Sequence, residues 1–234
     1  MGKKKKIPQI VKQIKNHTLK EINYAFEKAI SYSQMSMFLS CPHKWSLQYR
    51  DGYYTSEQSI HMTFGTALHE ALQHYITTIY EVSGAAADRI NLEELFTERF
   101  RAIYSQEYEK TGEHFTNAVE MREFFDDGIA ILDWIQKRRN KLFTIRKVKL
   151  LGIEMPLLIG VSKNIYLKGY IDFVLYDTEL DKIYIYDIKT STRGWSDREK
   201  KDDTKLSQIL LYKEYFGRQF GYDPDRIEVE YFIV

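Results

Sequence analysis

Residues 169–192 read GYIDFVLYDTELDKIYIYDIKTST, two apolar segments on either side of a polar turn. Their content of Ile, Tyr, Phe, Val and Leu is typical of β-strands. Asp172, Asp187 and Lys189 nevertheless lie inside these segments. Burying an unpaired carboxylate costs on the order of several kcal/mol, so the three charges require a specific reason.

A hairpin closed at the turn TELD gathers these charges on one face. If Asp177 pairs with Lys182, the same antiparallel register places Asp172 opposite Asp187, with their Cβ atoms about 5 Å apart. Lys189 follows two residues after Asp187 and therefore points to the same side of its strand. We expect two carboxylates and one ammonium group to converge.

Two carboxylates this close repel each other unless a cation lies between them. Oxygen ligands favour a hard divalent ion such as Mg²⁺ or Mn²⁺. The lysine can then stabilise charge that develops on a phosphate. The pattern thus indicates metal-assisted phosphodiester hydrolysis. The alternative is a surface hairpin in which the lysine merely neutralises its neighbours, because a bare D-x-K tripeptide recurs by chance.

The composition is that of an ordinary soluble globular chain. The 234 residues include 44% hydrophobic and 29% charged residues, with a net charge of +1. Such a balance gives no global sign of a polyanionic partner, so any nucleic-acid surface must be local. No apolar run reaches the roughly 20 residues that cross a bilayer, and the basic start MGKKKKIP lacks the apolar middle of a signal peptide. We expect a cytoplasmic protein without a membrane partner.

The pattern of apolar residues changes from helical to strand-like after Asn140. We expect the α+β class, a helical N-terminal half packed on a small mixed sheet of β-β-β-α-β order. Residues 1–30 form a basic N-terminal segment, and 31–234 form one domain with a helical part (31–140) and a catalytic sheet core (141–234). Helices are predicted over 19–29, 63–81 and 205–216, the last ended by Gly217.

Several motifs in this order are similar to those of one nuclease family. The arrangement G-x-I-D, then D-x-K-T, then Q-x-x-x-Y resembles the PD-(D/E)XK nuclease superfamily and, within it, the RecB-type exonuclease branch. Upstream, SYSQMSMFLSCPHKW (31–45), FGTALHEAL (64–72) and GIEMPL (152–157) resemble further motifs of that branch. Singly each motif is weak, but together they extend over most of the chain.

The resemblance implies a restriction-endonuclease-like core and specific roles for individual residues. His69, Asp172, Asp187 and the backbone carbonyl of Ile188 would bind the metal, and Lys189 would be the catalytic lysine. Further positions would serve the site from neighbouring elements: Gln208 and Tyr212 on one face of a helix, and Glu154 as a secondary metal contact or structural hydrogen-bond partner. Without the motif, a lone histidine on an amphipathic helix is usually a core or surface residue.

Cys41 marks a departure from the branch. Several RecB-type nucleases hold an iron–sulfur cluster with a cysteine before proline and three later cysteines, whereas this sequence contains one cysteine in total. We expect no iron–sulfur cluster and interpret Cys41 as a small buried residue where Pro42 breaks a helix.

The segment STRGWSDREKKDDT (191–204) is the candidate DNA-contacting loop. Arg193 and Trp195 combine a cation with an aromatic ring that can stack on an unpaired base. The acidic residues of the loop nearly cancel its charge, so a solvated loop remains the alternative.

These observations favour a metal-dependent deoxyribonuclease, an exonuclease that acts on DNA in recombination, repair or replication. Two alternatives remain: a non-catalytic nucleic-acid-binding accessory module, and a restriction-type endonuclease with the same catalytic core. The intact D…D-x-K set disfavours the first, and the helical half with G-x-x-x-H disfavours the second. The sequence leaves open whether a helicase or recombination protein supplies the substrate.

Overall fold

The computed structural model describes residues 8–53, 58–191 and 193–234. The predicted basic run Lys3–Lys6 lies outside this part of the chain. The chain forms two compact units, which are described separately. The sheet unit comprises Met1–Tyr54, Leu151–Asp187 and Asp197–Tyr231, and the helical unit comprises Thr55–Leu150, Ile188–Ser196 and Phe232–Val234.

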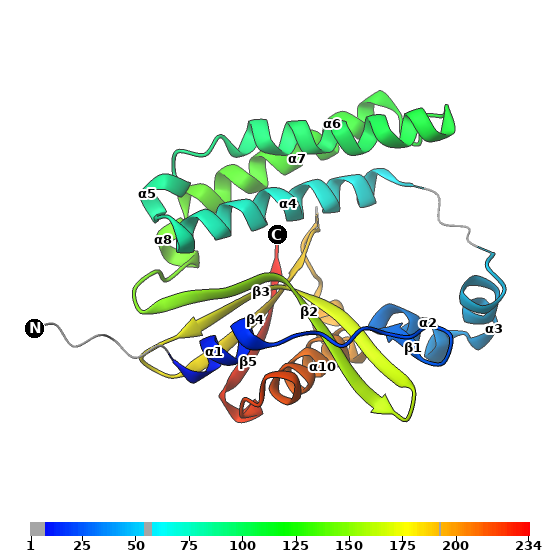
Figure 1. Cartoon of the computed structure of the whole chain (residues 1–234). Coiled ribbons are helices and arrows are strands. Elements are labelled where there is room, and N and C mark those ends of the chain that lie inside the picture. Colours follow the sequence, from blue (N-terminus) through cyan, green and yellow to red (C-terminus); the bar gives the residue numbers. More distant parts are fainter. Residues whose placement is uncertain (1–7, 54–57, 192) are drawn as a thin grey trace, which may run out of the picture. The chain divides into compact units, whose positions relative to one another are not determined.

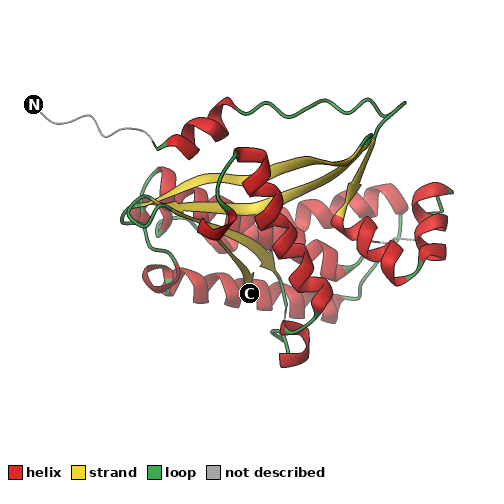
Figure 2. Ribbon diagram, turned by 90° about the horizontal axis from the view of Figure 1, so that it is seen from below, coloured by secondary structure: helices red, strands yellow, loops and turns green. Residues whose placement is uncertain are grey.

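Five strands form a single mixed sheet within the described residues, in the order β1-β3-β4-β5 with β2 also paired to β3 (Figure 2). The last residues of β4 and β5 are grouped with the helical unit. The expected α+β class, with helices followed by β-β-β-α-β, is confirmed, and β1 is an additional strand. The strands are β1 (Lys28–Ser31), β2 (Val148–Ser162), β3 (Ile165–Asp177), β4 (Lys182–Lys189) and β5 (Ile227–Ile233).

The β3–β4 hairpin has the predicted register. It is antiparallel and runs from Phe173 opposite Tyr186 to Asp177 opposite Lys182. The Asp177 carboxylate closes the turn by accepting hydrogen bonds from the backbone N–H groups of Glu179 and Leu180, at 2.7 and 2.9 Å. Short polar side chains commonly stabilise turns in this way.

The helix α10 (Asp203–Phe220) packs its apolar residues into the core of the sheet unit. It extends beyond the predicted end at Gly217 and stops at Gly221, which has a φ of 62°. The prediction was wrong because Gly217 serves a close contact instead: a Cβ there would lie 2.9 Å from the carbonyl oxygen of Tyr222. The core also contains residues of β2 to β5 and Ile10 of α1 (Gln9–Asn16).

The predicted helix over residues 19–29 is not formed. The chain has no regular helix between residues 17 and 27 and then enters β1, which pairs in parallel with β3 from Lys28 opposite Ile165. An isolated short helix is marginal in water, whereas the edge of β3 offers partners such as the Asn164 carbonyl, which accepts from Lys28 N–H at 2.8 Å. Tertiary pairing thus overrides the local pattern.

Cys41 is exposed, which contradicts the predicted buried position. It lies between α2 (Tyr32–Ser40) and α3 (Pro42–Trp45), where it ends the first helix and caps the second. Its Sγ accepts a hydrogen bond from Lys44 N–H at 3.4 Å. The thiol is therefore used as a cap at the junction of two helices and is not packed into a core. A π-helical turn (Ser46–Arg50) follows.

The helical unit contains three long helices that run alongside one another (Figure 1). The predicted helix over 63–81 corresponds to α4, where Leu68, Leu72, Tyr75, Ile76 and Ile79, spaced three or four residues apart or adjacent, are all buried on one face. In the described part of the chain no helix combines the length and apolar character of a membrane span. The helices of this unit are α4 (Ile60–Glu81), α5 (Gly84–Ala87), α6 (Leu92–Thr111), α7 (Ala118–Lys137) and α8 (Arg139–Leu142), and the remaining short elements of the chain are α9 (Asp197–Lys200) and a 3₁₀ turn (Pro224–Arg226).

Candidate active site

Two buried carboxylates occupy the middle of the sheet. Asp172 on β3 is 8% exposed and Asp187 on β4 is 3% exposed, and they are the charged residues buried within 8–53, 58–191 and 193–234. The observed register, continued by one residue beyond Phe173 and Tyr186, places the two carboxylates opposite each other. Opposed like charges repel and favour either a shared proton or a bound cation.

Glu154 brings a third carboxylate to this place from β2. One of its oxygens lies within 4.8 Å of a carboxylate oxygen of Asp172. Two oxygens can ligate one divalent ion at this separation, because each metal–oxygen bond is about 2.0–2.6 Å. Glu154 also has a φ of 47°, a left-handed conformation that costs on the order of 1–3 kcal/mol for a residue with a side chain.

Gln208 and Tyr212 support the carboxylates from α10. Gln208 Nε2 lies 3.5 Å from Asp187 Oδ1, a long hydrogen bond, and 3.1 Å from Tyr212 Oη. Because the two residues are four apart on a helix, they share a face, as the sequence predicted. One amide thus connects Asp187 to the phenol.

The Tyr212 hydroxyl is a neutral group beside acidic ones. The pKa of Tyr212 is raised to about 12, chiefly by burial; the hydrogen bond from Gln208 lowers it, and the negative charges of Asp187, Asp172 and Glu154 raise it. A phenol with this pKa keeps its proton at neutral pH. Tyr212 is therefore a hydrogen-bond donor next to three carboxylates.

Two residues that sequence reasoning missed hold this arrangement in place. A Cβ on Gly169 would lie 3.2 Å from Cε1 of Tyr212, so the glycine at the start of GYID makes room for the ring. The pKa of Tyr231 is raised, chiefly by burial and then by the charge of Asp187, and its hydroxyl donates to the Lys205 carbonyl at 2.5 Å. The glycine of the G-x-I-D motif was a usable sequence signal for Gly169, whereas no motif in the sequence pointed to Tyr231.

His69 lies in the helical unit, on α4. Its Nε2 is 2.9 Å from the backbone carbonyl oxygen of Ile188, and Ile188 follows Asp187 directly in the chain. One turn earlier, a Cβ on Gly65 would lie 3.3 Å from Oγ1 of Thr190. Four helical residues rise about 6 Å and two strand residues about 6.6 Å, so the G-x-x-x-H spacing matches the segment from Thr190 back to Ile188.

Lys189 ends β4 and is half-buried. Its carbonyl oxygen accepts a hydrogen bond from Val234 N–H at 2.9 Å, and Ser191 N–H donates to the Val234 carbonyl at 2.7 Å. This pairing fixes the backbone on both sides of Thr190. Strand alternation along β4 predicts the same face for Lys189 and Asp187.

The described residues of the candidate DNA-contacting loop and of the helix start that follows it include ion pairs. Arg193 is exposed and Trp195 half-buried. Farther along, Lys200 pairs with Asp197 at 3.7 Å, and Lys205 pairs with Glu199 at 3.3 Å. These ion pairs favour the alternative of a largely neutralised loop.

The donor set fits a hard divalent cation. Asp172, Asp187 and Glu154 offer carboxylate oxygens, two of them buried in apolar surroundings where net negative charge is costly. Oxygen donors select Mg²⁺, Mn²⁺ or Ca²⁺ over thiophilic metals. The residues present are therefore compatible with a divalent metal ion.

Comparison with known proteins agrees with this site. No curated protein matches the chain. Residues 29–234, however, match the sequence profile of the PD-(D/E)XK nuclease superfamily. The match includes both strands of the acidic hairpin, α4 with His69 and α10 with its Gln208–Tyr212 pair. The chain belongs to the PD-(D/E)XK nuclease superfamily.

Proposed function

We propose that this protein is a divalent-metal-dependent deoxyribonuclease, an exonuclease of the RecB type that trims DNA ends in recombination, repair or replication. The observation that carries the proposal is the buried pair Asp172 and Asp187, with a Glu154 oxygen within 4.8 Å of Asp172 and a lysine two residues after Asp187. A binding module has no need of this set, because two buried like charges without a catalytic cation destabilise a fold.

The proposed metal ligands are Asp172, Asp187, His69 and the carbonyl oxygen of Ile188, with Glu154 as a further contact. The 2.9 Å separation of His69 Nε2 from the Ile188 oxygen supports this assignment, because adjacent ligands of an octahedral ion with bonds of about 2.1 Å lie about 3 Å apart. When bound, Mg²⁺ or Mn²⁺ would supply Lewis-acid polarisation of the scissile phosphate. The assignment requires the two units to act together as one nuclease domain; the peptide bond between Asp187 and Ile188 is one of the places where the chain passes from one unit to the other.

The chain's own residues would supply the remaining chemistry. Lys189 holds a positive charge on the same strand face as Asp187 and would stabilise negative charge that grows on the phosphate oxygens in the transition state. Gln208 would keep the Asp187 carboxylate in one orientation through its amide, and Tyr212 would hold Gln208. Arg193 and Trp195 are the proposed contacts to DNA in the loop that follows Lys189.

The biological setting is also a proposal. The motif order 31–45, 64–72 and 152–157 supports the RecB-type branch, in which an accessory helicase or recombination protein would deliver DNA ends. A cytoplasmic location suits the exposed thiol of Cys41, which stays reduced in a reducing compartment.

The decisive experiment is a cleavage assay with the pure protein. End-labelled single-stranded DNA, end-labelled linear duplex and covalently closed circular duplex would each be incubated with Mn²⁺, Mg²⁺ or EDTA. We expect release of short labelled products from linear DNA with either metal and none with EDTA. Cutting of the circle at the same rate would instead support the restriction-type endonuclease, and an absence of cleavage under every condition would support the binding module.

A further inference from the structure

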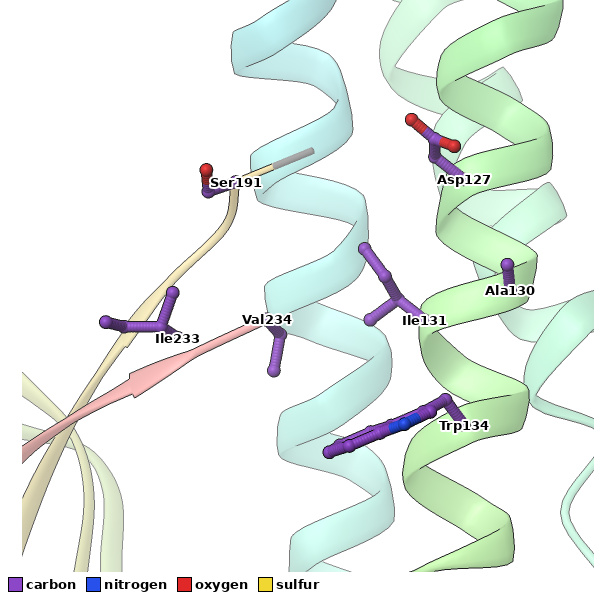
Figure 3. Close-up of a pocket in the computed structure, with 7 residues that line it drawn as sticks. All are labelled: Asp127, Ala130, Ile131, Trp134, Ser191, Ile233 and Val234. Carbon is purple, nitrogen blue, oxygen red and sulfur yellow. The ribbon is translucent and has the colours of Figure 1, made fainter. Parts of the chain in front are cut away.

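A cavity of about 360 Å³ lies in the helical unit beside α7. Figure 3 shows Ile131 and Trp134 on α7 pointing towards Val234, while Ser191, on the segment that follows β4, also lines the pocket. Its lining is mainly apolar, with Asp127 and Ser191 as polar groups. A pocket of this kind, apolar with few polar groups, is typical of sites for small ligands. We refer to it as the Trp134 pocket.

The pocket adjoins the strand end that carries Lys189. Val234, which lines it, hydrogen-bonds through its backbone both to the Lys189 carbonyl and to the Ser191 N–H, at 2.9 and 2.7 Å. Ser191 itself is two residues after Lys189, or about 7 Å of extended chain. A ligand in the pocket therefore lies within a short distance of the proposed catalytic lysine.

Trp134 presents an aromatic surface beside a cation. Its side chain is 45% exposed, and the guanidinium carbon of Arg138 lies 4.7 Å from the centroid of the indole ring. The neighbouring basic residues form ion pairs: Lys137 pairs with Asp133 at 2.6 Å, and Arg139 pairs with Asp88 at 2.7 Å. An exposed large indole with an adjacent guanidinium is the combination that stacks an unpaired base and neutralises its phosphate.

The polar groups orient such a ligand. The Asp127 carboxylate is an acceptor for the amino groups on base edges, and the Ser191 hydroxyl, which donates to the Gly194 carbonyl at 3.1 Å, can still accept. Because Asp127 repels phosphate, the base edge would face Asp127 and the backbone would face Arg138. We propose that the Trp134 pocket binds an unpaired base of a single-stranded DNA end close to Lys189; this rests on the function proposed above and specifies its substrate.

The test measures DNA binding in EDTA, where cleavage does not interfere. A labelled short oligodeoxycytidine would be titrated with the full chain, and its dissociation constant followed by fluorescence anisotropy. Trp134→Leu keeps an apolar side chain but removes the stacking surface, whereas Trp134→Phe retains a ring. Trp45→Phe is the matched control, because Trp45 lies on α3 in the sheet unit and packs against Phe38. Circular dichroism and thermal melting would establish that each variant is folded.

We expect Trp134→Leu to weaken binding of the single strand by about 5- to 150-fold, since one stacked base contributes on the order of 1–3 kcal/mol. Trp134→Phe should stay close to the parent, Trp45→Phe should match it, and a blunt hairpin duplex should bind the parent and Trp134→Leu alike. Equal single-strand affinity of parent and Trp134→Leu would overturn the proposal, whether or not the parent cleaves DNA. Conversely, a parent that binds through Trp134 but never cleaves would support the pocket while refuting the proposed nuclease activity.

Discussion

The imidazole Nε2 of His69 lies 2.9 Å from the backbone carbonyl oxygen of Ile188. More than a hundred residues separate these two positions, yet the fold of the helical unit brings them within hydrogen-bonding distance. Ile188 is joined by one peptide bond to Asp187, whose carboxylate is buried in the sheet unit. The relationship explains why a histidine on a long helix can belong with a strand far along the chain.

We predict that His69→Ala weakens Mn²⁺ binding more than Mg²⁺ binding. The loss of Mn²⁺ affinity should be at least on the order of 10-fold, because even residues that only support metal ligands contribute this much. Imidazole nitrogen is a better ligand for Mn²⁺ than for Mg²⁺. Isothermal titration calorimetry with each metal measures the two effects. His74→Ala is the matched control, because His74 is exposed on the same helix. Unchanged Mn²⁺ affinity in His69→Ala would remove His69 from the site.

Substitution of either buried carboxylate should lower the cleavage activity but raise the stability of the protein in EDTA. Asp172→Asn and Asp187→Asn remove one charge without changing the volume, so we expect cleavage to fall by about 10²- to 10³-fold. The free energy of unfolding in EDTA should rise, because repulsion between the two carboxylates is relieved.

Stabilisation by bound metal provides a second test of the same variants. The parent should gain about 2.7 kcal/mol at a metal concentration of 100 times Kd, and the Asn variants should lose most of this gain. Urea denaturation with and without Mn²⁺ measures it. A variant that is stabilised by Mn²⁺ as strongly as the parent would contradict the ligand assignment.

Lys189 is predicted to act on turnover and not on binding. Lys189→Ala should reduce kcat by about 10²- to 10³-fold, since the lysine stabilises charge that develops in the transition state. Its affinity for DNA in EDTA and for Mn²⁺ should remain close to the parent values. A loss that lies entirely in DNA affinity would identify Lys189 as a phosphate anchor instead.

The local patterns of the sequence predicted the elements that depend on neighbours in the chain. The buried stripe of α4 follows from the 3.6-residue period, and the β3–β4 register follows from a short turn between two strands. Both Asp172 opposite Asp187 and the shared face of Gln208 and Tyr212 are consequences of such local geometry.

Features that depend on distant contacts were not accessible in this way. Strand β1 owes its conformation to the edge of β3, so a short apolar segment there was misread as a helix. Gly217 looked like a helix end but permits a close contact with Tyr222, and the exposure of Cys41 depends on how two helices meet at Pro42. Neither the left-handed φ of Glu154 nor the space at Gly169 has a signature in local periodicity.

Glu154 combines a carboxylate near Asp172 with a strained backbone, so two substitutions separate the two properties. Glu154→Gly and Glu154→Ala both remove the carboxylate, and we expect both to lower cleavage. Only glycine relieves the positive φ, so Glu154→Gly should be more stable than Glu154→Ala by about 1 kcal/mol. Urea denaturation in EDTA measures the difference. Equal stability of the two variants would mean that the backbone at residue 154 relaxes without cost.

Gly169 is predicted to act on the site through Tyr212. In Gly169→Ala the new Cβ would lie 3.2 Å from Tyr212 Cε1, so the ring must move, and overpacking of this kind costs about 1–3 kcal/mol. Tyr212 holds Gln208, and Gln208 contacts Asp187. Small displacements in an active site reduce the reaction rate, so we expect cleavage to fall by roughly 10- to 100-fold.

Two controls establish that the effect of Gly169→Ala passes through the Tyr212 ring. Gly160→Ala also adds a methyl group to a strand of the sheet, but its nearest neighbour, Tyr166 Cε1, is at 3.5 Å, an ordinary contact; it should change stability by less than about 0.5 kcal/mol. In a Tyr212→Leu background the ring is absent, so Gly169→Ala should there lose most of its cost, a coupling that a double-mutant cycle measures by urea denaturation. If Gly169→Ala is equally destabilising with Tyr and with Leu at position 212, the glycine is required by the strand itself and not by the phenol beside the carboxylates.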